Sequence, residues 1–143
     1  GHAVTGVDRD AQALALAAAS GQPVEADIEN GPWPLAGHQF GGVVVTNYLW
    51  RDLMPAIVAC VAPGGVLIYE TFAEGNETVG RPARPEFLLR HGELLELAGT
   101  RAGLRVVAYE DGFLDTPPRF VQRIAAVRLP SGSEPGRHDL GKP

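Results

Sequence analysis

Residues 40–72 read FGGVVVTNYLWRDLMPAIVACVAPGGVLIYETF and contain a complete strand–helix–strand pattern. Phe40–Val45 is a continuously apolar run, which is typical of a strand with both faces covered by helices. Arg51–Val61 has helical character, and its proline lies near the first turn, where proline is tolerated. A Pro-Gly-Gly break follows, and Val66–Phe72 then predicts a second buried strand. This order indicates two parallel strands joined by a helix.

The residues before this stretch repeat the same pattern. Ala3–Val7 predicts a short buried strand. Asp10 is a suitable cap for a helix over Ala11–Ala19, which consists largely of strong helix formers. Val24–Ala26 predicts another strand, and an Asn-, Gly- and Pro-rich loop follows it. The first third of the chain is therefore a second strand–helix–strand unit.

The residues after it complete the sheet. Ala73–Arg84 is polar and glycine-containing, so we expect a mobile loop that acts as a lid or faces the substrate. Pro85–Ala98 predicts one helix, or two short ones broken at its glycine. Leu104–Glu110 and Phe120–Leu129 predict strands separated by a turn too short for a crossover, so they must be antiparallel neighbours. The fold class is α/β, a Rossmann-like, mostly parallel sheet with a C-terminal antiparallel hairpin.

Composition limits the class of protein. The chain has 143 residues, 45% of them hydrophobic and 20% charged, with a net charge of −5, which is typical of a soluble globular protein. Its longest apolar run is too short to cross a membrane, and its basic residues are too scattered for a nucleic-acid surface. Cys60 is the single cysteine, so an intrachain disulfide is excluded. We expect a cytoplasmic setting and no metal site. We expect one domain over residues 1–129 and a flexible tail over 130–143.

Polar side chains follow successive predicted strands. They are Asp8, Asp27, Asn47 and Glu70. In open α/β sheets, ligands bind beyond the carboxyl ends of the strands. A carboxylate only accepts hydrogen bonds, so it suits a ligand with ribose hydroxyls and an adenine amine. Capping of the following helix or loop explains the two aspartates equally well.

Five segments together resemble class I S-adenosylmethionine-dependent methyltransferases. Gly1–Asp10 is similar to the second strand of that family, Val24–Ile28 to the third and Phe40–Leu49 to the fourth. Ala62–Glu70 resembles the Pro-Gly-Gly turn and fifth strand. Phe87–Leu95 is similar to a small bacterial, tellurite-resistance-like subgroup. The predicted terminal hairpin also fits, because the family closes its sheet with an antiparallel strand.

The resemblance implies S-adenosylmethionine as cofactor and methyl transfer to a small-molecule acceptor. By analogy, Asp8 accepts both ribose hydroxyls, and Arg9 lies at the edge of the adenosine pocket. Asp27 accepts the adenine N6 amine, and the backbone N–H of Ile28 donates to the ring. These are roles implied by similarity, carried over position by position.

Asn47 is implied to lie beside the methionine part of the cofactor, and Tyr48 and Leu49 to form pocket walls. Trp50 and Arg51 are further candidates for shaping the site, although core packing explains the aromatic residues equally well. No catalytic residue follows from the resemblance. Four residues are candidates for a general base by type alone: Tyr69, Glu70, His91 and Tyr109.

The sequence departs from the family at its start. The resemblance implies a strand order of 3-2-1-4-5-7-6, and no segment here matches the first strand or the glycine-rich loop after it. We therefore expect an N-terminally truncated chain that binds the cofactor weakly or not at all. Two other functions stay open: an NAD(P)-dependent Rossmann oxidoreductase, which also has an acidic residue after its second strand, and a non-catalytic fragment.

Overall fold

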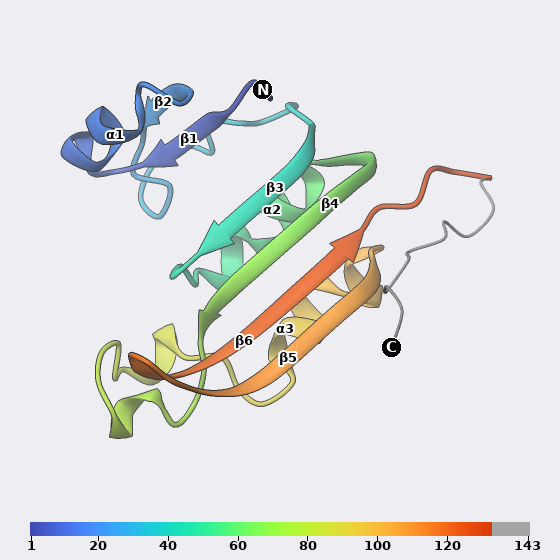
Figure 1. Cartoon of the computed structure of the whole chain (residues 1–143). Helices are drawn as coiled ribbons and strands as arrows, with labels where there is room; N and C mark the ends of the chain where they lie inside the picture. The colour runs from blue at the N-terminus through green and yellow to red at the C-terminus, as the bar shows by residue number, and fades with distance from the viewer. Residues whose placement is uncertain (133–143) are drawn as a thin grey trace. The chain divides into compact units, whose positions relative to one another are not determined.

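A computed structural model describes residues 1–132, so part of the predicted tail, residues 133–143, lies outside the described residues. The chain divides into two compact units (Figure 1). The first is Gly1–Gly37, and the second begins at His38. Among the described residues, no helix is both long enough and apolar enough to cross a membrane.

The first unit is the predicted strand–helix–strand unit. Strand β1 spans Thr5–Asp8, helix α1 spans Ala11–Ala17 and strand β2 spans Gln22–Glu25. The carboxylate of Asp10 caps α1, accepting hydrogen bonds from two N–H groups of its first turn at 2.8 and 3.3 Å. The two strands are parallel and pair in register along their whole length, so their carboxyl ends meet at one edge.

The second unit contains a four-stranded sheet in the order β3-β4-β6-β5. Its strands are β3 (Phe40–Thr46), β4 (Val61–Phe72), β5 (Arg105–Asp115) and β6 (Pro118–Val127). Strands β3 and β4 are parallel, whereas β6 is antiparallel to both β4 and β5. The α/β class and the C-terminal antiparallel hairpin are thus confirmed. The order β3-β4-β6-β5 agrees with the part 4-5-7-6 of the order that the resemblance implies, and the pair β1-β2 agrees with its neighbours 3-2.

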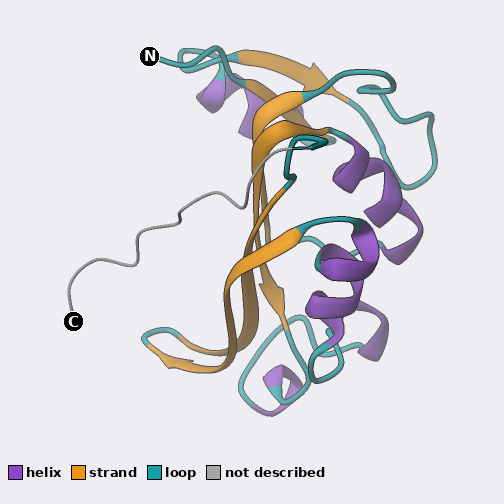
Figure 2. Cartoon of the chain, turned by 90° about the vertical axis from the view of Figure 1, so that its right-hand side faces the viewer, coloured by secondary structure: helices purple, strands orange, loops and turns teal. Residues whose placement is uncertain are grey.

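Short helices cover one face of this sheet. Helix α2 spans Met54–Ala59 and α3 spans Glu93–Ala98, and both lie on the same side of the strands in Figure 2. Four single turns of 3₁₀ helix accompany them: η1 (Arg51–Leu53), η2 (Asn76–Thr78), η3 (Pro85–Phe87) and η4 (Thr100–Ala102). The core between helices and sheet includes Met54, Ile57, Leu67, Tyr69, Leu94, Ala98, Ile124 and Ala126.

The opposite face of β3 and β4 differs from the sequence-based expectation. Val44 is 68% exposed and Ile68, its partner on β4, is 47% exposed. Their neighbours Leu67 and Tyr69 point to the helical side and are fully buried. The run Val43–Val45 therefore alternates in burial, and within residues 38–132 helices cover only one face of this pair.

The predicted helix over Arg51–Val61 is too long, because α2 ends at Ala59 and β4 already begins at Val61. The Pro-Gly-Gly break then lies inside β4 as an irregularity in its pairing with β3. Gly65 is required there, since a Cβ atom would lie 2.8 Å from the carbonyl oxygen of Ala62 and 2.9 Å from that of Phe40. Hydrogen bonds with the backbone of Arg128 extend the strand through this point.

The loop over Ala73–Arg84, expected to be mobile, is held by one buried side chain. Asn76 is 1% exposed, and its amide donates to the carbonyl of Pro82 at 3.0 Å. Its oxygen accepts from the backbone N–H of Phe120 at 3.2 Å. The loop is therefore closed on itself and fastened to β6 by Asn76, whereas its composition predicted a mobile loop, and its mobility stays a prediction. The two-helix alternative for Pro85–Ala98 is confirmed, with Gly92 left-handed at φ 75° between the helices.

Candidate functional site

The two aspartates singled out in the sequence lie at the same edge of the first unit. Asp8 is the last residue of β1 and pairs with Glu25, the last residue of β2. Asp27 follows two residues later, and both aspartates are exposed. Because β1 and β2 are parallel, both carboxylates lie beyond the carboxyl ends of their strands, which is where ligands bind in this class of fold.

The carboxylate of Asp8 can still accept hydrogen bonds from a ligand. Its Oδ1 accepts a hydrogen bond from the backbone N–H of Asp10 at 2.9 Å. Its Oδ2 accepts none from any residue within 1–132. The helix cap is Asp10, so capping of α1 is not the role of Asp8. One whole carboxylate oxygen of Asp8 is available to a hydroxyl donor.

Asp27 is fastened into the turn that follows β2. Its Oδ1 accepts from the backbone N–H groups of Glu29 and Asn30, both at 3.1 Å, and its Oδ2 accepts from the Asn30 amide at 3.0 Å. These bonds lower the pKa of Asp27, the side chain of Asn30 contributing most and the charge of Arg9 least. The capping alternative thus holds for Asp27, although its charged form keeps further lone pairs.

The other two predicted residues of this unit are Arg9 and Ile28. Arg9 is exposed directly after β1. Ile28 is half-buried within the turn, and its backbone N–H donates no hydrogen bond to the described part of the chain. That N–H is therefore available to an acceptor on a ligand.

The remaining predicted residues lie in the second unit, directly after β3. Asn47 is exposed and adopts φ 53°, a left-handed conformation in which asparagine is tolerated better than most residues. Its N–H donates to the carbonyl of Glu70 at 3.0 Å, so the chain turns away from β3 at this point. The side chain of Asn47 consequently emerges at the carboxyl edge of the β3–β4 pair.

Tyr48 and Leu49 differ in accessibility. Tyr48 is half-buried, and its carbonyl oxygen accepts a hydrogen bond from the hydroxyl of Tyr69 at 2.6 Å. Leu49 is 5% exposed and belongs to the core of the unit, so its role as a pocket wall gains no support. The predicted site residues thus form two groups: Asp8, Arg9, Asp27 and Ile28 in one unit, and Asn47, Tyr48 and Leu49 in the other.

The first three general-base candidates are either buried or in contact with another side chain. Tyr69 is fully buried, and burial raises the pKa of its hydroxyl. Glu70 forms an ion pair with Arg123 at 2.5 Å on β6. His91 has an almost fully exposed side chain that contacts Asp111 at 2.7 Å.

Tyr109 is the fourth candidate. Partial burial, together with Asp111, raises the pKa of its hydroxyl to about 12. That hydroxyl donates to Asp111 at 3.3 Å, and it keeps its proton at neutral pH. None of the four stands out as a general base.

Sequence reasoning missed a polar network that includes Arg51, four residues after Asn47 in the chain. The guanidinium of Arg51 forms two hydrogen bonds with the carboxylate of Glu93, at 2.6 and 2.9 Å, and that carboxylate is 2% exposed. Gln122, fully buried on β6, accepts from the N–H of Leu94 and donates to the carbonyl of Arg90. The signal for such a network is weak in one sequence, because nothing in it pairs residues 42 positions apart.

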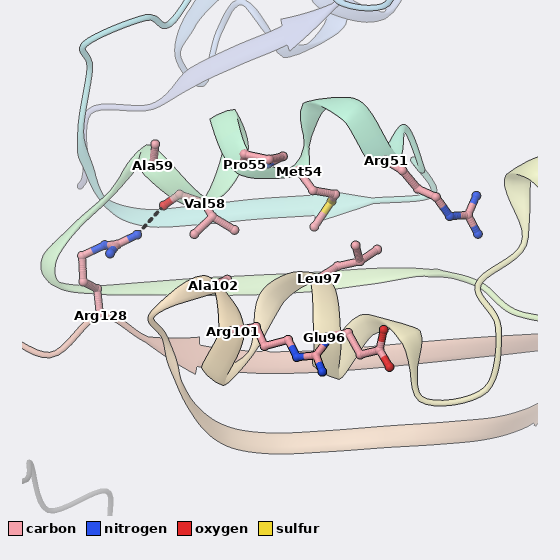
Figure 3. A pocket seen from close by; sticks show the side chains of 10 residues that line it. All are labelled: Arg51, Met54, Pro55, Val58, Ala59, Glu96, Leu97, Arg101, Ala102 and Arg128. Carbon is pink, nitrogen blue, oxygen red and sulfur yellow. Dashed lines mark hydrogen bonds between the residues drawn. The ribbon is translucent and has the colours of Figure 1, made fainter.

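A groove of about 480 Å³ lies between α2 and the α3–η4 segment (Figure 3). Its floor is apolar, and three arginines and one glutamate line it. Arg128 is fixed there by a 2.8 Å hydrogen bond to the carbonyl of Val58. Arg51, a candidate for shaping the site, lines the groove, but the residues predicted to bind the cofactor do not. Within residues 1–132 no three acidic, cysteine or histidine side chains are grouped as metal ligands.

Comparison with known proteins shows the fold. No protein-family model and no curated protein matches the sequence. Solved structures do: a SAM-dependent methyltransferase from Methanosarcina mazei is similar with a TM-score of 0.64 and 15% identity, over 90% of this chain and 83% of that one. The N-methyltransferase NodS from Bradyrhizobium japonicum gives a TM-score of 0.65 and 15% identity, over 90% and 74%.

TehB from Haemophilus influenzae gives a TM-score of 0.64 and 18% identity, over 90% of this chain. The chain spans half the length of TehB. All three identities are low, so the likeness establishes a common fold, that of SAM-dependent methyltransferases. Function in such folds is decided by the site.

Proposed function

We propose that this chain binds S-adenosylmethionine and belongs to an enzyme that transfers its methyl group to a small-molecule acceptor. The observation that carries the proposal is the pair Asp8 and Asp27, exposed together beyond the carboxyl ends of two parallel strands. The fold shared with SAM-dependent methyltransferases supports it. The tellurite-resistance-like subgroup is part of the proposal and rests on the resemblance of Phe87–Leu95.

Asp8 holds the ribose in this proposal. A ribose presents two neighbouring hydroxyl groups, and a carboxylate accepts from both without a proton of its own. Because Oδ2 of Asp8 has no donor among residues 1–132, such bonds cost no existing contact at that oxygen. Each bond to a charged acceptor contributes roughly 1.5–3 kcal/mol.

Asp27 and Ile28 hold the adenine. The amine of adenine is a donor, and the ring nitrogens are acceptors. Asp27 offers an acceptor that its lowered pKa keeps ionised, and the N–H of Ile28 offers a donor with no partner in the described chain. Arg9 lies near enough to affect Asp27 electrostatically and borders the same edge.

Asn47 orients the methionine part, with Tyr48 beside it. Asn47 follows β3 with a left-handed backbone and is exposed, so its side-chain amide can hydrogen-bond to an amino or carboxylate group. The bound cofactor supplies a methyl group already activated on a sulfonium. The contribution of the chain is then to position the donor and exclude water rather than to supply a base.

A titration with S-adenosylhomocysteine tests the proposal. We expect amide resonances of Asp8, Asp27, Ile28 and Asn47 to shift in two-dimensional NMR at up to millimolar ligand, which detects weak binding too. NAD⁺ serves as the competing ligand, because an oxidoreductase would respond to it instead. Shifts with NAD⁺ alone, or with neither ligand, would refute the proposal. Micromolar affinity would contradict the sequence-based expectation of weak binding.

A further inference from the structure

Arg51 joins two segments that are far apart in the sequence. It lies four residues after Asn47, at the start of η1. Besides its two bonds to Glu93, its guanidinium donates to the carbonyl oxygens of Glu86 at 2.8 Å and Leu88 at 3.0 Å. One side chain thus makes four hydrogen bonds to residues 86–93, which we call the 86–93 loop.

The 86–93 loop lies at the carboxyl end of β4. The N–H of Leu89 donates to the carbonyl of Phe72, and the N–H of Glu74 donates to the carbonyl of Leu89, both at 2.9 Å. Asn47 is bonded to β4 two residues earlier, at Glu70. The loop and Asn47 therefore emerge at the same edge of the sheet of the second unit.

The loop is also held from its other side. Gln122 donates to the carbonyl of Arg90 at 2.7 Å, and Glu93 accepts from the N–H of Arg90 at 2.8 Å. Since Glu93 and Gln122 are buried, a displacement of the loop would break several hydrogen bonds at once. Arg51 is consequently the connection between the 86–93 loop and the segment that contains Asn47.

We propose that Arg51 is a positioning residue that couples cofactor binding at Asn47 to the 86–93 loop, on which the methyl acceptor rests. The inference depends on the proposed function, because it requires a cofactor that contacts Asn47. Loops at the carboxyl edge carry substrate specificity in such folds. A cofactor that orders residues 47–50 would then order the loop through Arg51, so that the acceptor meets a site completed only when the donor is bound.

The chemistry requires arginine at this position. The planar guanidinium presents a fork of donors that engages both oxygens of Glu93 and two carbonyls at once. Lysine keeps the positive charge but has a single ammonium group, which cannot satisfy four acceptors in this arrangement. Arg51→Lys therefore keeps the positive charge at this position but removes the set of hydrogen bonds to the 86–93 loop.

Hydrogen exchange with S-adenosylhomocysteine as the probe tests the coupling without an acceptor. In the unaltered chain, we expect the ligand to slow exchange at residues 47–50 and, by about 5-fold or more, in the 86–93 loop. In Arg51→Lys, protection should remain at residues 47–50 and disappear from the loop. Arg84→Lys is the matched control, because Arg84 is mostly exposed and pairs with Glu86 on the surface, and it should behave as the unaltered chain.

The double variant Arg51→Met with Glu93→Leu guards against a loss of folding, since an apolar replacement of a buried ion pair often preserves stability. It should bind the probe without protecting the loop. Loop protection that persists in both variants, or binding that leaves the loop of the unaltered chain unprotected, overturns the inference while the proposed function stands. Absence of any binding to the unaltered chain overturns the proposed function, and the inference with it.

Discussion

Asp8 is the residue on which the adenosine part of the proposal depends. Replacing it by alanine removes both acceptor oxygens from the edge of the β1–β2 pair. We expect Asp8→Ala to weaken binding of S-adenosylhomocysteine by about 2–4 kcal/mol, which is about 30-fold to 700-fold in the dissociation constant. Isothermal titration calorimetry, or NMR titration if binding is weak, measures the change.

Asp115→Ala is the control for this experiment. Asp115 is also an exposed aspartate at the end of a strand, β5, and its side chain makes no hydrogen bond or ion pair within residues 1–132. Its replacement should leave the affinity unchanged. Equal affinity of Asp8→Ala and the unaltered chain would show that β1 is assigned to the wrong strand of the family.

Glu93 makes stability depend on pH. Burial by itself would raise its pKa, but hydrogen bonds from Arg51 and from the N–H and side chain of Arg90 outweigh burial and lower the pKa to about 2. A carboxyl group with a pKa lower in the folded than in the unfolded chain stabilises the fold above the unfolded pKa, near 4.5. That stability, up to about 3 kcal/mol, is lost as the pH falls from about 5 towards 2.

Urea unfolding of the unaltered chain and Glu93→Gln, measured from pH 7 down to pH 3, tests this. We expect the variant to be less stable at pH 7. The difference should shrink on acidification, because below about pH 4.5 the unfolded chain binds a proton at Glu93 that the folded chain does not, whereas glutamine does not titrate. A difference that stays constant with pH would show that Glu93 is not the group responsible.

At the scale of elements, Asn76 determines the conformation of the loop after β4. Asn76→Ala removes both hydrogen bonds and leaves the carbonyl of Pro82 and the N–H of Phe120 without those partners. We expect a loss of about 2–4 kcal/mol in the free energy of unfolding and faster hydrogen exchange over residues 77–84.

Val79→Ala is the control, because Val79 lies in the same loop and is 41% exposed. It should change stability by no more than about 0.5 kcal/mol. If Asn76→Ala leaves both stability and exchange unchanged, the loop is the mobile lid that its composition suggested.

The helices and strands were predicted well where residues close together in the sequence determine them. The strand–helix–strand order, the cap at Asp10 and the terminal hairpin follow from apolar runs, a capping side chain and a turn too short to cross the sheet. The end of α2 and the course of the Pro-Gly-Gly segment were not predicted. Gly65 lies within a strand because Arg128, the residue directly after β6, hydrogen-bonds to the backbone there, and that partner is far away in the sequence.

At the scale of the whole molecule, the division into two units has a measurable consequence. The first unit, Gly1–Gly37, is shorter than the ~40 residues below which a domain rarely buries enough surface to be stable alone. Each unit contains one of the two tryptophans, Trp33 or Trp50. Single-tryptophan variants therefore report on each unit separately.

We expect the fluorescence of Trp33, measured in Trp50→Phe, to change at a lower urea concentration than that of Trp50, measured in Trp33→Phe. The smaller unit has fewer buried groups to resist unfolding. Coincident midpoints for the two tryptophans would instead show that both units unfold as one cooperative domain.

The sequence by itself determined the α/β class, the alternation of strands and helices, and the polar residues that follow the strands. These features depend on the residue types and their local spacing, which act over a few positions of the chain. The exposure of Asp8 and Asp27 at one edge also follows, since both end parallel strands joined by a short helix.

Only the tertiary structure decided which of these side chains are buried and which partners they contact. It separated Asp8, with an unused oxygen, from Asp27, fastened by Asn30, and it placed Leu49 in the core. It also brought Arg51 to Glu93 and Asn76 to Phe120. These pairs lie 42 and 44 residues apart. Their energy comes from burial and hydrogen-bond geometry, which exist only after the strands have paired.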